Sequence, residues 1–241
     1  RYLTGGGLMF PIFAGNSAST GYNLTRSLRF RSSASAYLNR TPASTGNRQT
    51  FTISLWVKRG TLGSAGNQYL FGTYLTSLVD EFNFNFSSGD SLWVGDYQSA
   101  DNISLKTTQV FRDPSAWYHL VLAIDTTQAT SSNRVKVYVN GSQVTAFSTA
   151  IYPAQNYNTT VWNTSSPAAI GARGRVYTNN FDGYLAEYNF IDGQALTPSS
   201  FGSTNTLTGV WQPARYGGAY GTNGFYLPFT DNSALTTSSN V

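Results

Sequence analysis

Apolar and polar residues alternate with a period of two in several short runs, and this alternation constrains the fold more than any other feature. Residues 51–58 read Phe-Thr-Ile-Ser-Leu-Trp-Val-Lys, so four apolar side chains share one face of a strand. Residues 82–86 alternate strictly between Phe and Asn, and residues 118–124 and 135–139 follow the same pattern. The pair Asn140-Gly141 is the strongest short signal for a hairpin turn. The chain is therefore predicted to form antiparallel strands joined by tight turns.

The composition supports an all-β fold. Only 11% of the residues are charged, whereas a soluble domain has roughly 25%, and 15% are aromatic. A chain with this many aromatic residues and a net charge of +4 can bury a core, which excludes disorder. The helical signal is limited to one short turn that begins at Pro198. We therefore predict an antiparallel sandwich of two packed sheets.

The chain divides into three predicted parts. Residues 25–201 contain the main strand signals and form the predicted sandwich. Residues 1–24 form an extended N-terminal arm, because the triple glycine at residues 5–7 is too costly in backbone entropy for a regular element. This arm either lies over its own core or docks on a neighbouring chain. Residues 202–241 form a Gly/Tyr-rich C-terminal extension, which we expect to continue in a longer chain.

Several classes of site are excluded by residue counts. The chain has no cysteine and one histidine, so it can form neither a disulfide, nor a thiolate metal site, nor a multi-histidine zinc site. Its 15 basic residues are scattered among 11 acidic ones, so we expect no nucleic-acid partner. No apolar run approaches the roughly 18 residues of a membrane span, so we expect no membrane insertion. We expect His119 to be structural and bonded to a loop carbonyl.

Five segments, in order, resemble laminin G-like domains of the concanavalin A-like jelly-roll superfamily. They are the strand signals at residues 27–30 and 51–58, the Trp-Tyr-His strand at 117–121, the Tyr-Val-Asn-Gly hairpin at 137–141 and the closing strand at 181–187. Together they cover most of residues 27–200. The resemblance implies that the predicted sandwich is a concanavalin A-like jelly roll.

Three C-terminal segments, at residues 190–198, 209–213 and 220–227, resemble sequences in virion proteins of tailed bacteriophages. This resemblance implies a non-enzymatic structural component of a phage particle, such as a tail fibre, spike or decoration-type protein. Its location would be the virion, and its partners would be other virion proteins and copies of itself. The alternative function is a glycan-binding module that recognises a host-surface receptor.

The superfamily also includes glucanases, so the resemblance makes a pair of catalytic carboxylates an alternative to consider. Retaining glycosidases need two carboxyl groups about 5–5.5 Å apart, which the glucanases place on alternate residues of one strand. Here Glu81 follows Asp80 directly, so the two side chains face opposite ways on a strand. The same-face neighbours of Glu187 are Leu185 and Asn189. We therefore expect no enzymatic activity, and a glycoside hydrolase is the less favoured alternative.

Lectin-like sites combine exposed aromatic rings, which stack on sugars, with polar side chains that bind hydroxyl groups. Two stretches, residues 93–102 and 152–177, are rich in such residues. The candidate ligand-binding residues are Trp93, Asp96, Tyr97, Tyr157, Trp162, Arg173, Arg175 and Tyr177. For each aromatic residue, packing in the core or against another subunit is the alternative. Trp56 falls on the polar face of its strand, and we expect a loop to cover it.

Calcium is the one cofactor left open. Some laminin G-like domains bind calcium through loop aspartates, and the resemblance makes Asp125 and Asp182 the candidate ligands. The residues that follow each of them also favour an Asx turn, in which the carboxylate binds its own backbone. No calcium-loop spacing is present, so we otherwise expect no cofactor.

Overall fold

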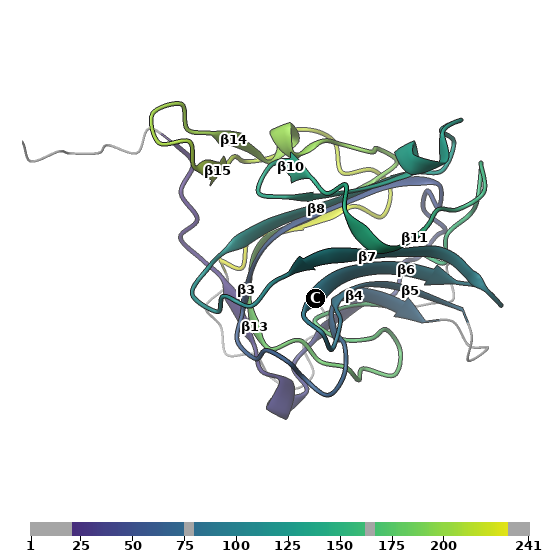
Figure 1. Ribbon diagram of the computed structural model, residues 1–241, viewed down its shortest axis with the longest axis horizontal. Helices are drawn as coiled ribbons and strands as arrows, with labels where there is room; N and C mark the ends of the chain where they lie inside the picture. Colours follow the sequence, from purple (N-terminus) through teal and green to yellow (C-terminus); the bar gives the residue numbers. More distant parts are fainter. Residues whose placement is uncertain (1–20, 75–79, 162–166, 231–241) are drawn as a thin grey trace, which may run out of the picture.

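The computed structural model describes residues 21–74, 80–161 and 167–230. Within these residues two antiparallel seven-stranded sheets pack face to face, and a two-stranded hairpin lies outside them (Figure 1). The predicted all-β sandwich is confirmed. The helical pieces of this part of the chain are short 3-10 turns at Ser32–Ala34, Ser131–Asn133 and Pro198–Ser200. Within the same ranges, no helix has the length and apolar composition needed to cross a bilayer.

The first sheet has the strand order β1-β13-β3-β8-β9-β10, and β16 also pairs with β13. Its strands are β1 (Leu28–Phe30), β3 (Thr50–Arg59), β8 (Tyr118–Asp125), β9 (Val135–Val139), β10 (Ser142–Gln143), β13 (Gly183–Asp192) and β16 (Phe225–Leu227). Asn140 and Gly141 adopt left-handed φ angles of 48° and 83°, as the predicted hairpin requires. The returning strand β10 is only two residues long, because the chain then crosses to the second sheet.

The second sheet has the order β11-β7-β6-β5-β4-β12-β2. Its strands are β2 (Leu38–Arg40), β4 (Gln68–Tyr74), β5 (Glu81–Phe86), β6 (Ser91–Tyr97), β7 (Asp101–Val110), β11 (Phe147–Ile151) and β12 (Ala168–Ile170). The alternation of β5 directs Phe82, Phe84 and Phe86 into the core. The outer face of this sheet therefore receives the polar side chains of the same strand.

Aromatic rings from both sheets meet in the core. Phe51 of the first sheet stacks on Phe190 with ring centroids 5.6 Å apart, and it meets Phe82 of the second sheet edge-on at 5.7 Å. Phe71 of β4 contacts Phe82 in the same edge-on manner. Such pairs stabilise a core by about 0.5–1.5 kcal/mol beyond the area that they bury. The apolar faces predicted from the alternation therefore provide the contact between the sheets.

Part of the C-terminal extension, including Tyr216 and Tyr220, packs on the outer face of the first sheet (Figure 1), whereas its strand β16 pairs with β13 within that sheet. Its hairpin consists of β14 (Gly202–Thr204) and β15 (Trp211–Pro213). A second apolar cluster lies beneath it and comprises Val121, Ala123, Tyr138, Ile191 and Phe201, packed against Leu196, Tyr216 and Tyr220. The outward side chains of β8 are apolar here and need a cover, which explains why this part of the extension lies on the sandwich rather than projecting from it.

His119 belongs to this covered face and is 1% exposed. It is structural, as predicted, but its ring binds side chains and not a loop carbonyl. The indole N–H of Trp211 donates to Nδ1 over 2.9 Å, so Nε2 carries the proton and donates to Ser54 Oγ, also over 2.9 Å. Burial lowers the pKa of His119 to about 3. Trp56 stacks on the same imidazole at 5.0 Å and is 8% exposed.

Candidate functional site

The outer face of the second sheet has a hollow of about 450 Å³. The strand register arranges the outward residues of β5, β6 and β7 in three rows. These rows are Asn85, Trp93 and Lys106; Asn83, Gly95 and Ser104; and Glu81, Tyr97 and Asp101. The middle row has the smallest side chains, so a trough runs between Trp93 on one side and Tyr97 on the other.

The floor of the hollow is fixed by hydrogen bonds. A Cβ atom on Gly95 would lie 2.5 Å from Nδ2 of Asn83, so the absence of a side chain at Gly95 lets the Asn83 amide lie across β6. Asn85 Nδ2 donates to Asn83 Oδ1 over 2.8 Å. The indole N–H of Trp93 donates to Ser104 Oγ over 3.2 Å, which sets the orientation of the ring. Trp93 remains partly exposed, so a ligand can reach a ring that is already oriented.

A charged cluster closes one end of the hollow. The hydroxyl of Tyr69 donates to Glu81 Oε1, and the guanidinium of Arg173 pairs with Glu81 Oε2. Arg173 also lies over the ring of Tyr74, with Cζ 4.5 Å from the centroid. Burial and the Glu81 carboxylate raise the pKa of Tyr69 well above its usual value. Burial opposes the charge of Arg173, but pairing with Glu81 outweighs it and raises the pKa of the guanidinium.

The Asp96 carboxylate lines this hollow but also holds a neighbouring loop. Asp96 is 1% exposed. The hydroxyl of Tyr157 donates to Oδ1 over 2.6 Å, and the backbone N–H and hydroxyl of Thr160 donate to Oδ2 over 2.8 and 3.0 Å. Burial raises the pKa of Asp96, and these donors oppose that rise. Asp96 and Tyr157 therefore have a structural role, and their contact with a ligand stays a prediction.

The hollow contains four of the predicted ligand-binding residues, namely Trp93, Asp96, Tyr97 and Arg173. Tyr157 reaches it only through its hydrogen bond to Asp96. Arg175 and Tyr177 belong to the loop after Arg173 and do not line the hollow. The Tyr177 ring instead stacks on Tyr37, with centroids 4.2 Å apart. Trp162 lies outside the described residues.

Asn67, Tyr69, Asn83 and Asn179 also line the hollow but were not among the predicted residues. The Phe-Asn alternation of residues 82–86 could have predicted that Asn83 lines this face, because it directs each asparagine away from the core. Tyr69 and Asn179 have no comparable signal. A bulge in β4 between Tyr69 and Phe71 interrupts the strict alternation there.

The two candidate calcium ligands are occupied by donors of the protein. Asp125 Oδ1 accepts the backbone N–H of Thr127 over 3.1 Å and its hydroxyl over 2.6 Å, which is the predicted Asx turn. Asp182 pairs with Arg29 over 2.8 Å and accepts the backbone N–H of Ser32. No group of three or more acidic or histidine residues suited to a metal occurs among the residues that the structure describes. The donor set therefore does not provide the converging oxygens that calcium requires.

Comparison with known proteins identifies the fold. A family model described as the concanavalin A-like lectin/glucanases superfamily matches residues 31–200. A putative carbohydrate-binding protein from Bacteroides ovatus has a similar structure, with a TM-score of 0.51 and 14% identity over 87% of this chain and 53% of its own. Domain 4 of the extracellular arabinanase AbnA from Geobacillus stearothermophilus, solved with arabinotriose, has a TM-score of 0.47 and 21% identity over 65% of each chain. No curated protein matches the chain by sequence.

Proposed function

Because the chain belongs to the concanavalin A-like lectin/glucanases superfamily, we propose that its lectin-like domain binds a saccharide in the hollow of the second sheet. The observation that carries this proposal is the partly exposed Trp93 ring beside a polar floor fixed by Asn83 and Ser104. A pyranose ring has an apolar face that stacks on an aromatic ring and hydroxyl groups that need hydrogen-bond partners. The row arrangement supplies both within one trough.

The carboxylates of the hollow favour binding over hydrolysis. Both oxygens of Glu81 accept hydrogen bonds from the protein, one from Tyr69 and the other from Arg173. Both oxygens of Asp96 are likewise bonded to protein donors. Asp101, the third carboxylate that lines the hollow, is exposed and would have to act alone. A retaining glycosidase needs one carboxylate free to attack the sugar and a second to donate a proton. The proposed function is therefore that of a non-enzymatic binding module.

A glycan array with the full chain tests this proposal. We expect Trp93→Ala to bind the saccharides that the native protein recognises with about tenfold lower affinity, because the variant loses the stacking contact. Tyr184→Ala is the matched control, since Tyr184 is an exposed aromatic residue on β13 of the other sheet. If no saccharide binds, or if Trp93→Ala binds as tightly as the native protein, the proposal fails.

We also propose the finer assignment, that the protein is a structural component of a tailed-phage particle. It rests on the resemblance of residues 190–198, 209–213 and 220–227 to phage virion proteins. Host-surface glycan would then be the ligand, and other virion proteins and copies of this chain would be the partners. Of the predicted arm, described residues 21–24 line a pocket of their own chain. Mass spectrometry of purified particles tests the assignment, and consistent absence of the chain from them refutes it.

A further inference from the structure

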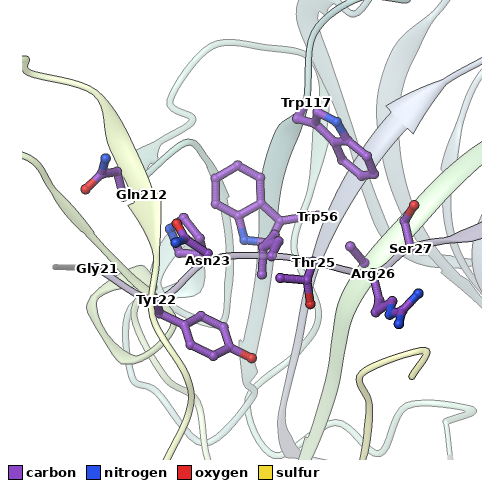
Figure 2. Close-up of a pocket in the computed structure, with 12 residues that line it drawn as sticks. Gly21, Tyr22, Asn23, Thr25, Arg26, Ser27, Trp56, Trp117 and Gln212 are labelled. Atoms are coloured by element: carbon purple, nitrogen blue, oxygen red, sulfur yellow. The ribbon is translucent and has the colours of Figure 1, made fainter. Parts of the chain in front are cut away.

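The outer face of the first sheet carries a separate hollow of about 400 Å³ (Figure 2). It lies on the opposite side of the sandwich from Trp93, and packed sheets are about 10 Å apart. Its lining consists of residues 21–27, which cross the sheet as a strap, together with Trp56, Trp117, Ala186, Gln212 and Pro213. This hollow is therefore distinct from the saccharide site proposed above and does not depend on it.

Two indole rings form the apolar part of this hollow. Figure 2 shows Trp56 at its centre, with Gln212 on one side and Trp117 on the other. Ala186 of β13 lies directly opposite Trp56 in the strand register, and its small side chain leaves space beside the indole. Trp56 is held in place by stacking on His119, whereas Trp117 is 36% exposed. One ring is thus a fixed floor, and the other is open to a ligand.

The strap is fixed on this face by a carboxylate. The hydroxyls of Tyr22 and Tyr226 both donate to Glu187 Oε1 over 2.8 Å. Glu187 lies in the bulge of β13 and adopts a left-handed φ of 48°, a strained conformation for this residue type. Such strain persists only where the surrounding contacts maintain it. The two tyrosine hydroxyls supply such contacts, so the wall that the strap forms is organised before any ligand arrives.

The charge of the hollow indicates which ligand it would take. Arg26 is the one charged residue among those that line it. Within the part of the chain that the structure describes, its guanidinium has neither an ion pair nor a hydrogen bond, and the residue is exposed. A guanidinium binds a carboxylate through two parallel hydrogen bonds. Figure 2 shows this side chain extending from the strap away from the two indoles, so the exposed guanidinium would turn toward them to meet a ligand. Two indoles and an unpaired guanidinium that line the same hollow match a sugar ring that bears a carboxylate.

We propose that this hollow is a second binding site, specific for an acidic saccharide of the uronic or sialic acid class. The pyranose ring would lie against Trp117, its carboxylate would pair with Arg26, and Asn23 and Gln212 would lie within reach of its hydroxyl groups. A volume of about 400 Å³ is within the usual range of small-molecule sites and exceeds the need of a single sugar ring. The domain would then present two saccharide sites on opposite faces.

Calorimetric titration of the full chain tests the second site. The probes are a galacturonic acid trisaccharide with its methyl ester, a glucuronic acid disaccharide with its methyl ester, and sialyllactose with lactose. We expect at least one acidic probe to bind about tenfold more tightly than its neutral counterpart, because the counterpart cannot pair with Arg26. Arg26→Gln should remove this preference, and Trp117→Ala should weaken binding of the same probe. Tyr184→Ala, which replaces an exposed ring that lines neither hollow, should leave it unchanged.

The outcomes separate the two sites. Absence of binding by every acidic probe, equal binding of acidic and neutral probes, or unchanged binding by Trp117→Ala overturns the second site. Loss of acidic binding in Trp93→Ala, with Trp117→Ala unaffected, assigns that binding to the second sheet instead and likewise overturns it. The site proposed around Trp93 can fail without affecting this result. Unfolding midpoints of the variants show that each is folded, and Trp117 is exposed enough for its replacement to be tolerated.

Discussion

Acid should destabilise this protein through His119, and the size of the effect follows from its burial. The ring is enclosed between Trp56 and Trp211, and its Nδ1 already accepts the Trp211 indole N–H. A proton on Nδ1 would break that hydrogen bond and place an unpaired charge in the protein interior. Burial lowers the pKa of folded His119 to about 3, whereas histidine in an unfolded chain has a pKa of about 6.5.

The sign of the pH dependence follows from these two pKa values. Between about pH 6.5 and pH 3 the unfolded chain binds a proton at His119 that the folded protein does not, so the free energy of unfolding falls as the pH falls. The loss is 1.36 kcal/mol for each pH unit below the unfolded pKa, which gives about 2 kcal/mol at pH 5. At pH 7 this contribution is close to zero.

The variant His119→Asn isolates this effect from the titration of the carboxylates. Its amide oxygen lies near the position of Nδ1 and can accept the Trp211 N–H, but it cannot bind a proton in this range. Urea unfolding of both proteins at pH 7, 6 and 5 gives the difference in their free energies of unfolding at each pH. We expect the native protein to lose about 2 kcal/mol relative to the variant between pH 7 and pH 5. A difference that does not change with pH would show that folded His119 takes up the proton, and the argument from burial would be wrong.

Two further predictions concern buried charge and backbone conformation. Asp90→Asn removes the carboxylate that pairs with Arg59, whose side chain is fully buried, and should lower the free energy of unfolding by about 3–5 kcal/mol. Arg112→Gln removes the exposed partner of the same carboxylate and should lower the free energy of unfolding by less than about 1 kcal/mol. Equal losses in urea unfolding would contradict this assignment. Gly141→Ala should cost about 2 kcal/mol or more, because it forces a left-handed φ on alanine and drives Cβ into an indole ring. Gly63→Ala replaces a glycine that also has a left-handed φ but has open space around it, so it should lower the free energy of unfolding by only about 1 kcal/mol in the same assay. Equal losses in the two glycine variants would show that the clash with the indole ring does not contribute.

The candidate site could be predicted only in part from the sequence. Trp93 and Tyr97 were predicted from their residue types in the stretch 93–102 and Arg173 from the loop-rich stretch 152–177, and the structure places all three around one hollow. The ion pair that closes this hollow joins Arg173 to Glu81, which are 92 positions apart in the chain. Such pairs depend on which strands become neighbours, and the residue pattern of each strand contains no information about that choice.

The alternation of apolar and polar residues by itself determined the all-β class and the strands β3, β5, β8 and β9 with the core side chains that they contribute, because a strand directs successive side chains to opposite faces. It could not determine what lies against the outward face, because the covering segment comes from a distant part of the chain. Tertiary packing decided that Trp211 reaches His119 and that Tyr22 reaches Glu187. It thereby covered part of one face of the sandwich, where the hollow beside Trp117 lies, and left an open trough on the other.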